Sequence, residues 1–557
     1  MQKGNYKMTN TFNKKNKSEL LLEMTDIQID GFADNRWHKI IKGMNLKLNK
    51  GEVLGLIGES GAGKSTMGKA AMGYTQPGCK LVGGSILFDG IDLVNISDQE
   101  KRNIWSTKIA YVAQSAAASF NPAHKLIFQT IEAAKKSKIN NEKFLIKDAI
   151  QLYKTLQLPN SETIGYRYPH QVSGGQLQRI MTAMAISPRP ELIIFDEPTT
   201  ALDVTTQVEV LAAIRDIVDE FNTAAIYITH DLAVVAQMAD RIKVLRYGEE
   251  VEEAETRNML SNPKEKYTKS LWSVRSLTKP EEKSLDAILS LENVNASYGK
   301  SKVLFNVSAK IPKGKTIAIV GESGSGKTTL AKVITGLLPQ TNGNINYNGK
   351  TLPSRLEKRT KEQLRKIQMI FQMPDTAINP RQTVEEIIGR PVEFYHGLKK
   401  NERKSRVIEL LKMIELDENY LYRFPQELSG GQKQRICIAR ALAANPELII
   451  CDEVTSALDQ IVQEEILKLL QKLQKELGVT YIFITHDIAT VKAISDEIVV
   501  MYQGKVVEQG MKSEILNPPF PDYTNLLLSS VPEMDPNWLS DLLNKRNNLK
   551  YKKEINQ

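Results

Sequence analysis

Short apolar runs that end in glycine or aspartate recur along the chain. Residues 53–57 form such a run before a glycine-rich turn, and residues 448–451 form another before an aspartate. Runs of this length, followed by turn residues and then by helical periodicity, predict buried parallel strands joined by crossover helices. They are far shorter than the ~20 apolar residues of a membrane helix. We therefore predict an α/β fold without a membrane span.

The chain also repeats itself. Four segments occur twice in the same order: GESGAGKS at 58–65 and GESGSGKT at 321–328, SGGQLQR at 173–179 and SGGQKQR at 429–435, the acidic pairs that end at Glu197 and Glu453, and the ITHD segments that contain His230 and His486. The last three pairs all keep a spacing of 256 residues. A spacing this constant indicates the duplication of a whole domain.

Domain boundaries follow from the repeat. The polar stretch KPEEKS at 279–284 contains a proline and no large apolar residue, which is typical of a junction. We predict a basic disordered tail at 1–20, a first domain at 21–280, a linker at 281–288, a second domain at 289–535 and a basic tail at 536–557. Between the glycine-rich loop and SGGQ each copy is more polar and helix-like, which predicts a separate helical subdomain.

The distribution of charge along the chain bears on whether the protein binds nucleic acid. The formal net charge is +9, but residues 1–18 carry +5 and residues 544–557 carry +4, so the two ends hold the whole excess. We expect these ends to be solvated tails and expect no nucleic-acid partner; attraction of the tails to an anionic membrane surface or to RNA is the alternative. Cys79, Cys437 and Cys451 are too scattered for a disulfide framework or a zinc site, which favours a reducing, cytoplasmic setting.

Both glycine-rich segments meet the template G-x-x-x-x-G-K-[ST] and follow an apolar strand. Glycines allow a tight turn whose N–H groups point at phosphates, and the next helix N-terminus favours the same charge. Lysine is expected at the terminal phosphates, and the Ser or Thr hydroxyl on Mg²⁺. The candidate ATP-binding residues of the loops are Gly58, Gly61, Gly63, Lys64, Ser65 and Thr66 in the first copy and Gly321, Gly324, Gly326, Lys327, Thr328 and Thr329 in the second.

An acidic pair follows a strand in each copy. Asp196 and Asp452 are predicted to reach the Mg²⁺ shell, and Glu197 and Glu453 to orient and activate the attacking water. Phosphoryl transfer needs positioning and charge neutralisation, which loop amides, lysine, Mg²⁺ and one carboxylate supply. An Asp–Glu pair alone is weak evidence, because strand ends commonly meet solvent. Its position relative to the loop makes it a prediction of ATP hydrolysis.

The order of phosphate loop, SGGQ, acidic strand end and histidine resembles the ATP-binding-cassette (ABC) ATPases over most of the chain. The resemblance implies two P-loop ABC ATPase domains in tandem, each with a RecA-like parallel-sheet core, a helical subdomain and a C-terminal extension. It also implies that SGGQ of one cassette covers the nucleotide held by the other, pairing Lys64 with Ser429 and Lys327 with Ser173. The implied signature residues are Ser173, Gly174, Gly175 and Gln176 and their copies Ser429, Gly430, Gly431 and Gln432.

The resemblance assigns roles to further pairs: Gln114 and Gln372 as Q-loop glutamines at Mg²⁺ and water, Asp203 and Asp459 in the D-loops, and His230 and His486 as switch histidines at the γ-phosphate. For the aromatic ring that stacks on adenine, Tyr298 fits in the second half. The first half departs from the family with a longer segment at 32–37, in which Phe32 is the candidate. Since neither half lacks its loop lysine, signature serine, glutamate or histidine, we predict two hydrolytically competent sites.

Finer details resemble the oligopeptide/dipeptide/nickel importer branch. These are SFNP and AINP after the two glutamines, YPHQVSGGQ at 168–176, and extensions that read NPKEKYTKSL from Asn262 and NPPFPDYTNLL from Asn517. The branch implies a motor peripheral to the cytoplasmic face of a bacterial cell membrane, beneath two transmembrane permease subunits served by an extracytoplasmic solute-binding protein. Short peptides, glutathione included, are the expected solute, and nickel or another chelated metal is the alternative.

A rival from another class is a twin-cassette ATPase that acts on ribosomes. Such proteins typically join their cassettes by a long charged helical linker. Here roughly sixty residues separate His230 from the second opening strand, and most of them complete the first domain and its extension. The spacing therefore favours the importer.

Overall fold

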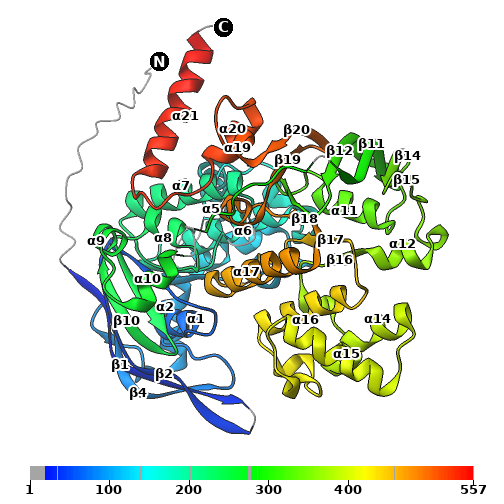
Figure 1. Cartoon of the computed structure of the whole chain (residues 1–557). Coiled ribbons are helices and arrows are strands. Elements are labelled where there is room, and N and C mark those ends of the chain that lie inside the picture. Colours follow the sequence, from blue (N-terminus) through cyan, green and yellow to red (C-terminus); the bar gives the residue numbers. More distant parts are fainter. Residues whose placement is uncertain are drawn as a thin grey trace. The chain divides into compact units, whose positions relative to one another are not determined.

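The structure is a computed structural model that describes residues 19–33, 35–136, 141–199, 202–273, 277–284, 286–456 and 458–555. The predicted tail at 1–20 lies outside these residues except for its last two. The chain forms two compact units (Figure 1). The first contains the described residues up to 199 together with 209–268 and 533–541, and the second contains 202–208, the described part of 269–532, and the residues from 542 onward.

The first unit is built on two sheets. The larger has the order β10-β9-β3-β8-β7-β6, with parallel pairing from β9 to β6 and an antiparallel edge strand β10. The smaller is antiparallel, in the order β2-β1-β4-β5. The strands are β1 Leu20–Ala33, β2 Arg36–Asn49, β3 Val53–Ile57, β4 Cys79–Phe88, β5 Ile91–Asp92, β6 Ile109–Val112, β7 Leu192–Asp196, β8 Ala224–Ile228, β9 Arg241–Arg246 and β10 Glu249–Glu255.

The second unit repeats this topology, with sheets β16-β17-β18-β13-β19-β20 and β12-β11-β14-β15. Every residue of β3, β7 and β8, and of their counterparts β13, β17 and β18, is buried, as helix-covered parallel strands require. The strands are β11 Ala287–Tyr298, β12 Ser301–Pro312, β13 Thr316–Val320, β14 Asn342–Tyr347, β15 Lys350–Thr351, β16 Ile367–Ile370, β17 Leu448–Asp452, β18 Thr480–Ile484, β19 Glu497–Tyr502 and β20 Lys505–Met511.

Helices connect these strands. Those of the first half are α1 Lys64–Ala70, α2 Asp98–Thr107, α3 Ala116–Ser119, α4 Leu126–Lys136, α5 Glu142–Thr155, α6 Gly174–Ile186, α7 Val204–Phe221, α8 Leu232–Met238, α9 Thr256–Ser261 and α10 Lys266–Ser273. Those of the second half are α11 Lys327–Thr335, α12 Lys361–Lys366, α13 Pro374–Ala377, α14 Val384–His396, α15 Lys400–Met413, α16 Gly430–Leu442, α17 Gln460–Leu477, α18 Ile488–Ile494, α19 Lys512–Ile515, α20 Asp522–Ser529 and α21 Trp538–Ile555. The fold is thus the predicted pair of α/β cassettes.

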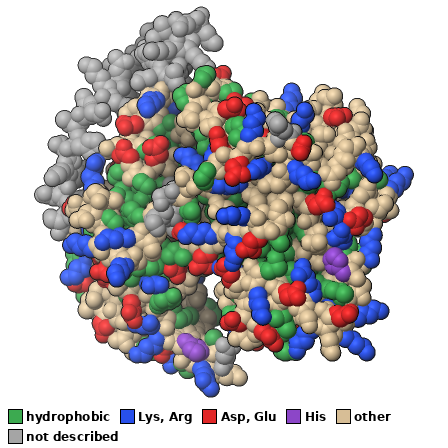
Figure 2. Space-filling model, in the orientation of Figure 1, with side chains coloured by type: hydrophobic (Ala, Val, Ile, Leu, Met, Phe, Trp, Pro, Cys, Tyr) green, Lys and Arg blue, Asp and Glu red, His purple; other side chains and the backbone are tan. Residues whose placement is uncertain are grey.

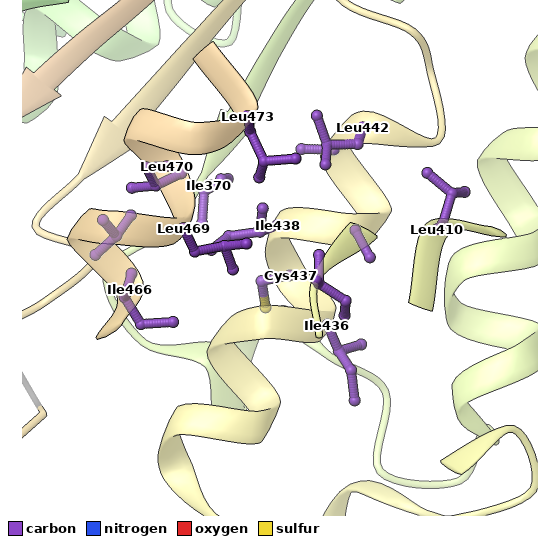
Figure 3. Close-up of a cluster of buried hydrophobic side chains, with 14 of the residues drawn as sticks. Ile370, Leu410, Ile436, Cys437, Ile438, Leu442, Ile466, Leu469, Leu470 and Leu473 are labelled. Carbon is purple, nitrogen blue, oxygen red and sulfur yellow. The ribbon is translucent and has the colours of Figure 1, made fainter. Parts of the chain in front are cut away.

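The helix that follows the SGGQ segment of the second unit, α16, is called here its signature helix. The apolar core beneath it shows why these helices form. Ile466, Leu470 and Leu473 recur at helical spacing on α17 and are fully buried (Figure 3). They belong to one cluster with residues of α16, including Cys437. Asp459 caps the start of α17 by accepting the Val462 N–H at 3.1 Å. This packing fixes the helix that carries Ser429 at its N-terminus.

The segment 533–541 follows the second cassette in sequence but is part of the first unit. The buried Gln237 donates to the carbonyls of Glu533 and Asp535 at 2.8 Å each, and its Oε1 accepts the Leu539 N–H at 3.1 Å. Leu539 is fully buried. Because its start carries buried apolar residues, this part of the expected basic tail at 536–557 begins a packed helix.

The segment 277–284 follows the first cassette and is part of the second unit. Lys279 forms an ion pair with the fully buried Asp496 at 2.6 Å. The Glu281 carboxylate accepts the N–H and hydroxyl of Ser513 at 2.8 and 2.6 Å. Residues 256 positions away make a matching contact in the first unit, where Arg257 donates to Asn537 Oδ1 at 2.9 Å. Each unit thus incorporates a segment that follows the other cassette in sequence.

Charged side chains of both signs are interspersed on the face that Figure 2 shows. This agrees with a body whose charges balance once the two ends are set aside. Within the described part of the chain, no helix is both long enough and apolar enough to cross a bilayer.

Candidate active sites

Each phosphate loop joins a buried strand to a helix. Gly58 leaves β3 with φ +150°, and a Cβ there would lie 2.2 Å from the Leu245 carbonyl oxygen, so only glycine fits. Gly63 caps α1 with φ +97°. Gly321 and Gly326 repeat these conformations before α11 at φ +152° and +101°. The glycines of the template are therefore required by the backbone itself.

The lysine of each loop folds back over the loop. Lys64 Nζ donates to the carbonyls of Gly58 and Glu59 at 2.7 and 2.8 Å. Lys327 Nζ makes the same contacts with Gly321 and Glu322, both at 2.8 Å. Burial lowers the pKa of Lys327, and nearby carboxylates oppose that shift. Each loop thus holds a buried ammonium at its centre, which suits an anionic ligand.

A hydroxyl and a carboxylate meet beside each lysine. Ser65 Oγ donates to Asp196 Oδ1 at 2.8 Å, and Thr328 Oγ1 donates to Asp452 Oδ1 at 3.1 Å. Both aspartates end a buried strand and are themselves buried. Hydroxyl and carboxylate oxygens are the hard ligands that Mg²⁺ takes, usually one or two from protein with the rest from phosphate and water. The donor set therefore fits Mg²⁺ bound together with a nucleotide.

The two carboxylates differ in their second partner. Tyr111 on β6 donates its hydroxyl to Asp196 Oδ2 at 2.5 Å. The equivalent position on β16 is Met369, since Tyr111 pairs with Ile194 of β7 and Met369 with Ile450 of β17. This asymmetry was not anticipated from the sequence.

Glutamine, glutamate and histidine form a hydrogen-bonded trio in each unit. Gln114 Nε2 donates to Glu197 Oε2 at 3.0 Å, while His230 Nδ1 lies 3.1 Å from Glu197 Oε1. In the second unit, Gln372 lies 2.7 Å from one oxygen of Glu453, and His486 lies 3.5 Å from the other. The structure thus brings these residues, which are far apart in sequence, together in both units.

Glu197 and Glu453 have an unusual backbone conformation, and each lies beside a histidine whose pKa it shifts. Glu197 and Glu453 each have φ +50°, in the left-handed region that non-glycine residues seldom adopt. Burial lowers the pKa of His230 and of His486, but the hydrogen bond and charge of the glutamate outweigh it and leave both pKa values raised. Burial acts to raise the pKa of Glu453, yet the His486 hydrogen bond and charge leave it lowered. Each pair therefore favours a histidinium beside a carboxylate.

The signature serines begin helices. Ser173 precedes α6 and accepts the Gln176 N–H at 3.3 Å, and Ser429 precedes α16 and accepts the Gln432 N–H at the same distance. Both serines are exposed, as are Gly174 and Gly430. Exposed hydroxyls at helix N-termini are well placed to meet an anion brought from outside their own cassette.

The predicted D-loop aspartates also cap helices. Asp203 accepts the Thr206 N–H at 3.0 Å before α7, and Asp459 caps α17. Thr205 belongs to the second unit, where its hydroxyl lies 2.8 Å from a Glu322 carboxylate oxygen. Asp203 also contributes to the electrostatic surroundings of Lys327.

The remaining candidates lie near the ends of the opening strands or at the starts of the helices that follow the phosphate loops. Phe32 near the end of β1 is 52% exposed, and Tyr298 at the end of β11 is 46% exposed, so both rings are open to a stacking partner. Thr66 and Thr329 lie in the first turns of α1 and α11. Phe32 also contacts Trp37, with ring centroids 5.3 Å apart.

Sequence reasoning missed three tyrosines at these sites. Besides Tyr111, the hydroxyls of Tyr267 and Tyr523 accept the N–H of Glu59 and Glu322 at 3.2 and 3.0 Å. The repeated YT pair of the two extensions was the available signal for the last two.

Twin strand–loop–helix phosphate sites, each with a hydroxyl–carboxylate pair and a Gln–Glu–His trio, define a P-loop ATPase of the cassette class. The chain matches the ABC transporter family over residues 41–200 and 304–456. It matches the C-terminal region of oligopeptide/dipeptide transporters over residues 507–557. The chain belongs to the ABC transporter family, and its two cassettes are those of an ATPase.

Relatives match nearly the whole chain. The glutathione import ATP-binding protein GsiA of Salmonella paratyphi A is 36% identical over 562 residues, which covers 93% of this chain and 90% of the relative. The protein of that name from Escherichia coli K12 is 33% identical with the same coverage. Among solved structures, an ABC transporter component from Clostridium perfringens is 32% identical, covers 41% of this chain and 90% of its own, and has a TM-score of 0.38.

Proposed function

We propose that this chain is the ATP-hydrolysing subunit of an importer for short peptides, with glutathione as the first solute to test. The two complete phosphate-loop and Gln–Glu–His sites carry the ATPase part of the proposal. Similarity to glutathione import ATP-binding proteins over 93% of the chain, and the oligopeptide/dipeptide transporter region at 507–557, support the peptide part.

The side chains divide the chemistry of hydrolysis between them. Loop amides and Lys64 would bind the phosphates, and Ser65, Asp196 and Gln114 would hold Mg²⁺ directly or through water. Bound Mg²⁺ neutralises phosphate charge. Glu197 accepts a hydrogen bond from the attacking water and takes its proton, while Gln114 and His230 keep the carboxylate oriented. The second site uses Lys327, Thr328, Asp452, Gln372, Glu453 and His486 in the same roles.

We propose that each ATP is shared between the cassettes, Lys64 acting with Ser429 and Lys327 with Ser173. Exposed serine hydroxyls at the N-termini of α6 and α16 support this pairing, because such groups donate well to a γ-phosphate. The contact of Thr205 with Glu322 supports it further, because Glu322 lies in the second phosphate loop. ATP then joins the two halves, and hydrolysis releases them.

The partners in this proposal are two transmembrane permease subunits and an extracytoplasmic solute-binding protein. The chain itself works at the cytoplasmic face of a bacterial membrane as a peripheral subunit, without nucleic acid. Peptide specificity resides in the partners, because the motor contacts ATP rather than solute.

Reconstitution tests this function. The chain is copurified with candidate permease subunits, and its ATPase activity is measured with a candidate binding protein and glutathione, a dipeptide, an oligopeptide or chelated nickel. Stimulation by glutathione or another peptide supports the proposal. Stimulation by nickel alone, or failure to assemble with any permease, contradicts it.

A further inference from the structure

Each C-terminal extension reaches the phosphate loop of its own unit through a tyrosine hydroxyl. The Glu59 N–H donates to Tyr267 Oη at 3.2 Å, and the Glu322 N–H donates to Tyr523 Oη at 3.0 Å. The two tyrosines lie 256 residues apart and belong to the repeated YT pairs. A contact formed twice in this way relates the extension to the ATP site, although the hydrolytic chemistry does not use it.

The tyrosine completes a chain of contacts that ends at the lysine. In the first loop, the Glu59 N–H is held by Tyr267 while the Glu59 carbonyl accepts Lys64 Nζ at 2.8 Å. Glu322 is held on both sides in the same way. This residue comes directly after the glycine at which the loop leaves its strand. The tyrosine therefore fixes the first bend of the loop, on which the lysine rests.

The extension is anchored on its other side. In the first unit, the Glu252 carboxylate on β10 accepts the N–H groups of Lys264 and Glu265 at 2.8 and 3.0 Å, at the start of α10. In the second unit, the equivalent Glu508 on β20 accepts the hydroxyl of the buried Thr524 at 2.8 Å. In both units the tyrosine of the YT pair contacts the phosphate loop. In the second unit the threonine of the pair also contacts the edge strand β20.

The tyrosine rings are held by packing as well. Tyr267 is 8% exposed, with the Arg246 guanidinium 4.4 Å from its ring centroid. The Tyr523 ring centroid lies 4.2 Å from that of Tyr502. Burial raises the pKa of Tyr523 to about 12, so its hydroxyl stays neutral at physiological pH. Packing around each ring therefore fixes the position of the neutral hydroxyl that accepts the N–H of the phosphate loop.

We propose that Tyr267 and Tyr523 are positioning residues through which each C-terminal extension holds the phosphate loop in its ATP-binding shape. The inference deepens the proposed function and rests on its assignment of these loops to ATP. It gives the oligopeptide-type extension a direct part in nucleotide affinity. Each tyrosine acts on the loop of its own unit.

The test uses the full chain with Y267F or Y523F, which remove one oxygen and keep the ring. Amide hydrogen exchange is measured without nucleotide at single-residue resolution, followed by titration with a non-hydrolysable ATP analogue and by ATPase kinetics. Y267F should accelerate exchange in residues 58–65 alone, and Y523F in residues 321–328 alone. Affinity at the affected site should fall roughly three- to tenfold, as expected for one hydrogen bond. KM should rise with little change in kcat.

Two tyrosines elsewhere provide matched controls. Tyr153 bonds to Thr130 at 2.6 Å, and Tyr347 bonds to Glu447 at 2.7 Å. Y153F and Y347F should leave loop exchange and nucleotide affinity unchanged, even where they lower the melting temperature. Unchanged loop exchange in Y267F and Y523F, or an equal rise in the controls, overturns the inference while the proposed function stands. A wild-type chain that binds no nucleotide overturns both.

Discussion

His230 Nδ1 lies 3.1 Å from Glu197 Oε1, and His486 repeats this contact with Glu453 at 3.5 Å. In both units a glutamine holds the other carboxylate oxygen. The glutamate is therefore fixed from two sides, and its strained backbone is retained in both copies. This geometry leads to the first two predictions.

Replacing either glutamate singly by glutamine should trap ATP and cut turnover. E197Q and E453Q keep the shape of the site but remove the proton acceptor, which typically contributes 10²–10⁴-fold. We expect steady-state ATPase activity to fall at least ~10-fold in each variant while the purified protein retains bound ATP. If one replacement leaves activity untouched, the two sites are not equivalent.

Both histidines should titrate above the usual pKa of ~6.5 for histidine. Burial lowers the pKa of each histidine, but the hydrogen bond and charge of its glutamate raise that pKa by more, so the net shift is upward. A folded-state pKa above the unfolded value adds stability that is fully present below pH ~6.5 and is lost as the pH rises through the folded pKa. NMR titration of the nucleotide-free chain measures the pKa of each histidine.

The glutamine variants supply the control for this titration. In E197Q only the pKa of His230 should fall, and in E453Q only that of His486. Histidines that titrate at or below the free value in the wild type would contradict the ion pair.

Tyr111 should make the first metal site tighter than the second. Its hydroxyl orients Asp196, whereas Met369 offers no such donor to Asp452. With Mn²⁺ as an EPR probe and a non-hydrolysable ATP analogue, the wild type should show two classes of site. Y111F should weaken the tighter class roughly tenfold or more, as expected when a ligating carboxylate loses a hydrogen-bond donor.

Substitution at the equivalent position gives the comparison. M369L conserves volume and should change neither class, while M369Y should tighten the weaker one. Identical Mn²⁺ sites in the wild type would refute this asymmetry.

Packing between the signature helix and α17 should dominate the stability of the second unit's helical region. Leu470 is fully buried among residues of α16 and α17 (Figure 3), so L470A should cost about 2–5 kcal/mol. Leu477 at the end of the same helix is 44% exposed, and L477A should cost less than ~0.5 kcal/mol. Denaturant unfolding of the full chain compares them, and equal effects would show that this cluster is not the core.

Much of the fold and site followed from the sequence because duplication and phosphate chemistry leave strong local patterns. The loops, the acidic strand ends and the histidines each lie within a few consecutive residues. Their assembly into a trio such as Gln114, Glu197 and His230 follows from the shared C-terminal edge of parallel strands. Their roles in catalysis remain predictions that the variants above address.

The contacts that sequence did not reveal depend on register and on residues far apart. Tyr111 meets Asp196 only because β6 and β7 pair in one register, and Tyr267 meets Glu59 across 208 positions. The basic C-terminal end misled in another way. Its net charge predicts a solvated tail, but Trp538 and Leu539 at its start are buried in the first unit.

The segments 277–284 and 533–541 bear on how such a protein is divided between genes. A break after residue 284 leaves the first half without 533–541 and the second half without 277–284, and each half instead carries the strip that the other unit incorporates. Separately expressed halves should therefore be individually incomplete but mutually complementing. Gene fission at this junction should therefore be tolerated only when both products are made together.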